Sequence, residues 1–254
     1  MTAKDVPKKT LEPCFYEVYR DDLNAVARRL VEDPSIVTSR DASGRTLLHL
    51  ANSAEMIHLL ARAGANVNAR DRLAMTPLVH FVAAPTVLTA KMVEALFECG
   101  SGCDITLCDN CEQTALHWIA MMGGTKPHHA LAVFRVLCAR VEAPLIERLS
   151  SSRNFYGETP LHVLGMRASS LWRRNRASVK VAETLVEMLI KAGGGETALH
   201  QRDNTERTPW QVARWRNTLP PRIIRQLNTM VDSDEDNNNA IVVSDGDYDD
   251  YMND

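Results

Sequence analysis

Five segments of similar sequence recur along this 254-residue chain, and each begins with a threonine that apolar residues follow. They read Thr-Leu-Leu-His, Thr-Pro-Leu, Thr-Ala-Leu-His, Thr-Pro-Leu-His and Thr-Pro-Trp, and they begin at Thr46, Thr76, Thr114, Thr159 and Thr208. A threonine side chain can cap a helix by accepting a backbone N–H bond, and proline suits the first helical turn. One helix start therefore recurs at intervals of 30, 38, 45 and 49 residues, which predicts stacked units instead of a closed globule.

Each threonine also follows an acidic residue or asparagine by five positions, and these residues are Asp41, Asp71, Asp109, Asn154 and Asp203. The clearest unit, 44–71, reads Gly-Arg-Thr-Leu-Leu-His-Leu-Ala, then Met-Ile-His-Leu-Leu-Ala-Arg-Ala-Gly, then Ala-Asn-Val-Asn-Ala-Arg-Asp. At these residues the sequence resembles the ankyrin repeat family. The resemblance covers about residues 11–231, and several copies in register make it specific.

The resemblance implies an all-α ankyrin repeat solenoid, with two helices per unit and β-hairpin fingers between units. We expect a flexible N-terminus over 1–10, about six repeats including caps over 11–231, and a disordered acidic tail over 232–254. Two excesses over the usual period of ~33 residues indicate insertions, one near 144–152 and one at 169–178. Thr197-Ala-Leu-His200 resembles another unit start, but it lies 11 residues before Thr208, so no helix pair fits between them.

Neither the histidines nor the cysteines indicate an enzyme. His49, His117 and His162 occupy the family's structural histidine position, and the chain has no nucleophile motif, Walker loop or dinucleotide fingerprint, so we expect no catalysis and no cofactor. Cys99, Cys103, Cys108 and Cys111, with His117 nearby, have a spacing that could bind zinc. The alternative, which we prefer, is that Cys103 fills a small buried position of a finger and that there is no metal.

Partner binding is the expected function, because stacked units form an extended concave surface. In the family register, the position after the structural histidine faces that surface, which here means Leu50, His80, Trp118 and Val163. Finger-tip positions add Leu73, Met75, Phe155 and Tyr156. Large aromatic and Met side chains often anchor interfaces, so Trp118→Ala is expected to weaken partner binding by ~2 kcal/mol with little change in stability, unless Trp118 packs in the core.

Charge is distributed unevenly along the chain. The whole chain has a formal net charge of −3, but 232–254 contains nine acidic and no basic residues, which leaves 29 basic and 23 acidic residues in 1–231. A basic loop contains Trp172, Arg173, Arg174, Arg176 and Lys180. It is either a solvated face or a site for an acidic partner, a nuclear-import factor or the tail.

The acidic tail contains two short motifs. Ser233 and Ser244 each precede acidic residues and are candidate phosphorylation sites, since phosphate would deepen a negative field. Ile241, Val242 and Val243 resemble a SUMO-interacting motif, which would bind by strand addition.

We therefore predict a non-catalytic adaptor or stoichiometric inhibitor that binds another protein, with transcription-factor or kinase regulation as possible settings. The alternative is a nuclear or chromatin-associated regulator that uses the basic loop and a SUMO-binding tail. No segment is apolar enough to cross a membrane, and nucleic-acid binding is not favoured because no known motif is present. The polar N-terminus is unlike a secretory signal, so we expect reduced cysteines and a location in the cytoplasm, the nucleus or both.

Overall fold

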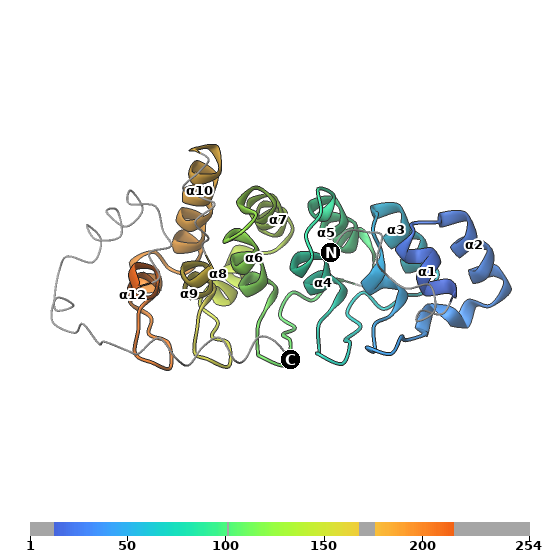
Figure 1. Cartoon of the computed structure of the whole chain (residues 1–254), viewed down its shortest axis with the longest axis horizontal. Coiled ribbons are helices and arrows are strands. Elements are labelled where there is room, and N and C mark those ends of the chain that lie inside the picture. The colour runs from blue at the N-terminus through green and yellow to red at the C-terminus, as the bar shows by residue number, and fades with distance from the viewer. Residues whose placement is uncertain (1–12, 101, 168–175, 216–254) are drawn as a thin grey trace.

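The computed structural model describes residues 13–100, 102–167 and 176–215. Within these ranges it contains helices and no β-strand, and successive helix pairs stand side by side in a single row (Figure 1). The elements are α1 (Pro13–Tyr19), α2 (Leu23–Glu32), η1 (Pro34–Thr38), η2 (Leu47–Leu50), α3 (Ala54–Arg62), α4 (Pro77–Ala83), α5 (Thr89–Glu98), α6 (Ala115–Gly123), α7 (Pro127–Arg140), α8 (Ala143–Ser150), α9 (Pro160–Arg167), α10 (Arg176–Ala192), α11 (Glu196–His200) and α12 (Pro209–Trp215). The predicted all-α solenoid is confirmed.

The predicted helix starts coincide with the recurring threonines. The helices α4, α6, α9 and α12 each begin one residue after a threonine, and proline or alanine occupies the first helical position. The second unit is shorter, because η2 is a single 3₁₀ turn and Ser53 caps α3 by accepting a bond from the amide of Met56 (3.0 Å). That short turn explains the 30-residue spacing.

The insertions are partly helical. The excess near 144–152 forms the additional helix α8, and the segment beginning at Thr197 lies in the five-residue helix α11, which is too short to start a repeat. Part of the insertion at 169–178 lies outside the described residues, and its end forms the first turn of α10.

One apolar core runs continuously through the row and joins neighbouring units. Its largest fully buried side chains include Phe15, Leu60, Leu96, Leu116 and Phe134, which come from the first four units. Burying each such side chain stabilises the fold by ~1.5–3 kcal/mol. Because each unit shares its core with the next, no unit buries its apolar face alone, as stacked repeats require.

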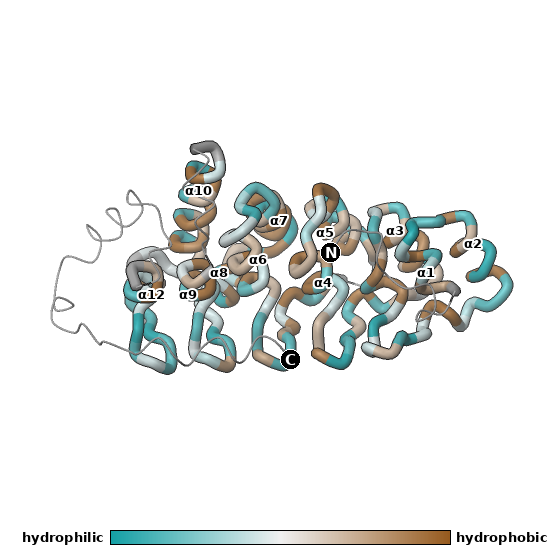
Figure 2. Tube along the Cα trace, in the orientation of Figure 1, coloured by the Kyte–Doolittle hydropathy of each residue, from teal (hydrophilic) through white to brown (hydrophobic). Residues whose placement is uncertain are grey.

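Five loops, which we call fingers 1 to 5, extend from one side of the row (Figure 1). They contain Asp41, Asp71, Asp109, Asn154 and Asp203 respectively. In Figure 2 the fingers are largely hydrophilic, with hydrophobic residues at several of their tips. No residue of these loops is in a strand, so the expected β-hairpins are tight turns instead.

Candidate protein-binding surface

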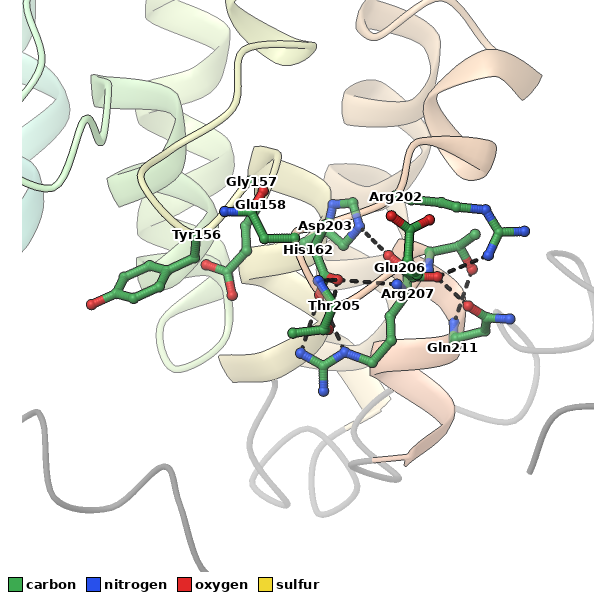
Figure 3. A network of polar contacts seen from close by, with 12 residues as sticks. Tyr156, Gly157, Glu158, His162, Arg202, Asp203, Thr205, Glu206, Arg207 and Gln211 are labelled. Atoms are coloured by element: carbon green, nitrogen blue, oxygen red, sulfur yellow. Dashed lines mark hydrogen bonds and ion pairs between the residues drawn. The ribbon is translucent and has the colours of Figure 1, made fainter. Parts of the chain in front are cut away.

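Each finger is folded around the side chain of its Asp or Asn. In finger 3, Oδ1 of Asp109 accepts bonds from the backbone amides of Cys111 (2.8 Å) and Gln113 (2.9 Å), and the amide of Asp109 donates to the carbonyl of Gln113 (3.1 Å). The other four fingers repeat this pattern, and Figure 3 shows it in finger 5 around Asp203. A short side chain that accepts two amides fixes a tight turn.

Burial alone would raise the pKa of Asp41, Asp71 and Asp203. Hydrogen bonds outweigh that effect, and they come from Arg45 to Asp41, from His80 to Asp71, and from Thr205 and Arg207 to Asp203, together with backbone amides. The pKa of each carboxyl is therefore held below its ordinary value, so the ionised form is the one that stabilises the turn.

Backbone hydrogen bonds join each finger to the next and form a ladder along the tips. The amide of Arg72 donates to the carbonyl of Ser43 (3.0 Å), and the amide of Asn110 donates to that of Leu73 (3.0 Å). In the same way, the amide of Phe155 donates to the carbonyl of Cys111 (3.0 Å), and the amide of Asn204 donates to the carbonyl of Tyr156 (3.1 Å). The tips therefore form one connected surface instead of five independent loops.

The three structural histidines join the helices to this ladder. Nδ1 of His117 accepts a bond from the amide of Thr114 (3.2 Å), and Nε2 reaches the carbonyl of Glu158 in finger 4 (2.9 Å). His49 and His162 make the same two contacts with the neighbouring units. This arrangement requires the neutral tautomer with the proton on Nε2, because Nδ1 must accept.

Burial lowers the pKa of these imidazoles. It lowers the pKa of His49 and His117 to about 4, and it lowers that of His162 as well. Bonds to the carbonyls of Met75, Glu158 and Arg207 oppose this effect but do not cancel it. The three side chains are buried and fully engaged in the fold, which agrees with a structural role.

Two of the predicted partner-binding residues are bonded to finger aspartates. Nε2 of His80 lies 2.8 Å from Oδ2 of Asp71, and Nε1 of Trp118 donates to Oδ2 of Asp109 over 3.0 Å. Both side chains are half-buried. Leu50 is also half-buried against the core. The first helical turns therefore support the fingers as well as contributing to the surface beside them.

Trp118 is expected to matter for stability, contrary to the simple expectation from its position in the sequence. Replacing it with alanine removes core packing and leaves an oxygen of the buried Asp109 without its donor, so unfolding should become easier by ~3 kcal/mol. Trp118→Phe keeps most of the ring, loses only the donor and should cost ~1–2 kcal/mol. Urea unfolding of the unaltered chain and both variants measures these losses: a Trp118→Phe variant as stable as the unaltered chain would mean that the bond to Asp109 contributes nothing, and equal stabilities of the two variants would mean that the ring packing contributes nothing.

The largest exposed apolar side chains on the fingers are at three predicted positions. Leu73 in finger 2 is 60% exposed, and Phe155 and Tyr156 in finger 4 are 65% and 43% exposed. The rings of Phe155 and Tyr156 meet edge to face, with centroids 5.5 Å apart. Cys111 is exposed at the tip of finger 3, between the other two. We call these four residues the tip row.

Two other residues that were expected on the contact surface are buried instead. Met75 is 8% exposed and Val163 is 2% exposed, so neither can contribute a large contact area. Met75 lies at the base of its finger, where its backbone carbonyl accepts a bond from the amide of Asp71 and contacts Nε2 of His49. Val163 lies on α9, which α12 packs against, and its side chain belongs to the shared core.

The cysteines do not gather around a metal position. Cys99 is buried at the end of α5, whereas Cys111 is exposed at a finger tip. Burial raises the pKa of Cys103 to about 12, which keeps the thiol protonated at neutral pH. Among the described residues, no group of three or more His, Cys, Asp and Glu side chains could hold a metal ion.

Several predicted sites lie outside the described residues. These are Trp172, Arg173 and Arg174 of the basic loop, the tail motif Ile241, Val242 and Val243, and the candidate phosphorylation sites Ser233 and Ser244. Arg176 is the first residue of α10, and Lys180 is exposed on the same helix. None of the described helices combines the length and the apolar character needed to traverse a lipid bilayer.

Comparison with known proteins agrees with the geometry. The family model for the ankyrin repeat matches residues 43–72. An ankyrin repeat domain from Acinetobacter baumannii has the same fold, with a TM-score of 0.60 and 22% identity over 86% of this chain and 97% of that one. A chain from the complex of a predatory endopeptidase of Bdellovibrio bacteriovorus with an immunity protein also superposes, with a TM-score of 0.62 and 18% identity over 87% of this chain and 99% of that one.

A curated relative matches over a shorter stretch. The serine/threonine-protein kinase VIK of Arabidopsis thaliana is 37% identical over 85 residues, which are 32% of this chain and 19% of the kinase. The match therefore spans about a fifth of the kinase.

Proposed function

We propose that this chain, which is an ankyrin repeat protein, is a non-catalytic protein-binding module that recognises its partner through the tip row. Ankyrin arrays are protein–protein interaction modules, and the finer role proposed here is that of an adaptor or stoichiometric inhibitor. The observation that carries the proposal is the exposure of Leu73, Cys111, Phe155 and Tyr156 on three consecutive fingers.

Physical arguments favour this surface as the contact site. Apolar side chains that gather on a rigid surface can bury area in a partner without a large loss of conformational entropy, and aromatic residues are common anchors of interfaces. The backbone ladder holds the tips in fixed register, so the surface is organised before binding. An inhibitory role has a parallel in the endopeptidase complex, in which a chain of the same fold occurs.

The test compares two variants of the full chain. Phe155→Ser removes the most exposed aromatic ring of the tip row, while Val87→Ser changes a residue that is 86% exposed in the loop between α4 and α5. A partner recovered from the native source should bind the Val87→Ser variant like the unaltered chain and the Phe155→Ser variant at least tenfold more weakly in calorimetry. Equal binding by the two variants would place the interface elsewhere.

A further inference from the structure

Arginine side chains reinforce most of the junctions between fingers. Nη1 of Arg40 donates to the carbonyl of Gly44 in its own finger (2.5 Å) and to that of Arg70 in the next (2.7 Å). Arg70 repeats this one unit later, donating from Nε to Ala74 (3.2 Å) and from Nη2 to Cys108 (2.8 Å). One guanidinium therefore bridges two carbonyl groups on successive fingers.

Arg153 bridges fingers 4 and 5 in the same way. It donates to the carbonyls of Gly157 (3.0 Å) and Arg202 (2.8 Å). Between fingers 3 and 4, however, the bridging position is occupied by Cys108, which has no guanidinium. This junction therefore lacks a bridge that the three other junctions have.

A second side-chain bridge is absent from the same junction. Nδ2 of Asn110 donates to the carbonyl of Arg72 (3.2 Å) and joins finger 3 to finger 2, and Nδ2 of Asn204 joins finger 5 to the carbonyl of Phe155 (3.1 Å). The equivalent residue of finger 4 is Phe155 itself, which cannot donate from its side chain. Along the tips, fingers 3 and 4 are joined by one backbone bond alone among the described residues.

The register identifies the carbonyl groups that are left without these bridges. By analogy with Arg70 and Arg153, a guanidinium at this junction would reach the carbonyls of Glu112 and Arg153. No described side chain or backbone amide donates to either oxygen. The exposed carboxylate of Glu112 lies in the same finger, and Cys108 is small and half-buried, so it leaves room that an arginine fills elsewhere.

We propose that this junction binds the guanidinium of an arginine supplied by the protein partner, with an apolar residue beside it on Cys111 and Phe155. The chain itself shows the fitting ligand, because its own arginines occupy the equivalent position at the other three junctions. A guanidinium is a planar group with several donors, so it can bridge two carbonyls, whereas a lysine ammonium is a compact point charge. The carboxylate of Glu112 adds charge complementarity. This inference rests on the proposed function and names the chemistry of the partner.

The test uses a displayed library of random peptides selected on the full chain. Cys108→Arg supplies the missing guanidinium from within, so it should lower peptide affinity at least tenfold while leaving the melting temperature equal or higher. Replacing the peptide's arginine with citrulline or lysine should weaken binding to a similar extent. Cys108→Ser is the matched control, and it should bind like the unaltered chain.

The possible outcomes separate this inference from the proposed function. The arginine site would be overturned if the selected peptides contain no arginine, fail to bind the Phe155→Ser variant and still bind the Cys108→Arg variant. In that case the tip row would remain an interface. Peptides insensitive to both variants would overturn both proposals. If Cys108→Arg does not fold, Glu112→Gln takes its place: it should weaken the arginine peptide about threefold and leave the citrulline peptide unchanged, and equal effects on both peptides would overturn the inference.

Discussion

Lowering the pH from 7 to 4 is expected to reduce the free energy of unfolding of this array by roughly 6 kcal/mol, half of it from His49 and half from His117. Burial lowers the pKa of both imidazoles to about 4, compared with ~6.5 in the unfolded chain, and each unit of difference is worth ~1.4 kcal/mol. His162 adds a loss of the same sign. Since small domains are stable by only ~5–15 kcal/mol, this effect is large.

The direction follows from proton binding. Above ~pH 6.5 the histidines are neutral in both states, and their contribution to stability is complete. As the pH falls, the unfolded chain takes up protons first, so stability is lost down to about pH 4, where the folded histidines also protonate. Asp41, Asp71 and Asp203 act below that range, because their lowered pKa values make stability fall only as the pH drops below ~4.

The chain supplies its own control for the histidine effect. In the last unit Gln211 occupies the histidine position, and its Oε1 accepts a bond from the amide of Thr208 over 2.8 Å. His117→Gln copies that arrangement without a titrating group. Urea unfolding between pH 7 and pH 4.5 should therefore be less pH-dependent for this variant, and an unchanged slope would show that His117 does not drive acid unfolding.

Gly157→Ala is expected to destabilise the C-terminal end of the array by ~3 kcal/mol, through strain and overpacking together. Gly157 has a φ of +75°, and a Cβ atom there would lie 2.2 Å from Oδ1 and 2.7 Å from the backbone nitrogen of Asn204. The collision with backbone would separate these fingers and break the bond from Asn204 to Tyr156. Thermal unfolding and amide hydrogen exchange at Asn204 measure the effect.

Gly64→Ala is the matched control, because this glycine is the left-handed residue that follows α3 (φ +93°) and a Cβ atom added there would have no other atom within 4 Å. It should lose only the ~1–2 kcal/mol of left-handed strain. Ala74, Glu112 and Glu206 occupy the same finger position as Gly157 with φ near +60°, so the chain tolerates that strain where space allows. If both glycine variants lose the same stability, backbone strain and not the collision is responsible.

The repeat organisation could be predicted because it depends on local chemistry. A threonine that starts a helix and an aspartate that closes a turn act over a few residues. The helix start at Thr114 and the turn at Asp109 could therefore be read from the sequence, and both are present in the structure. The short helix at Thr197 was likewise excluded as a unit by distance along the chain alone.

The site was harder to predict because it depends on neighbouring units. Val163 has the register of a surface residue, but α12 packs against its helix. The bond from Trp118 to Asp109 spans two elements, and nothing local in the sequence indicates it. The left-handed conformations of Ala74 and Glu112 also gave no signal, because neither is a glycine. A comparison of the five fingers position by position would have shown that Cys108 replaces an arginine.

The finger ladder runs in one direction, because every later finger donates an amide and every earlier finger accepts it. Among the described residues, the amide of Ala42 in finger 1 and the carbonyl of Thr205 in finger 5 have no partner in this ladder. The first finger therefore presents an unused amide donor, and the last finger presents an unused carbonyl acceptor. The two ends of the array are complementary to each other, and neither end is complementary to a second copy of itself. An engineered extra unit would consequently have to match the acceptor edge at one end or the donor edge at the other, and like ends could not be joined.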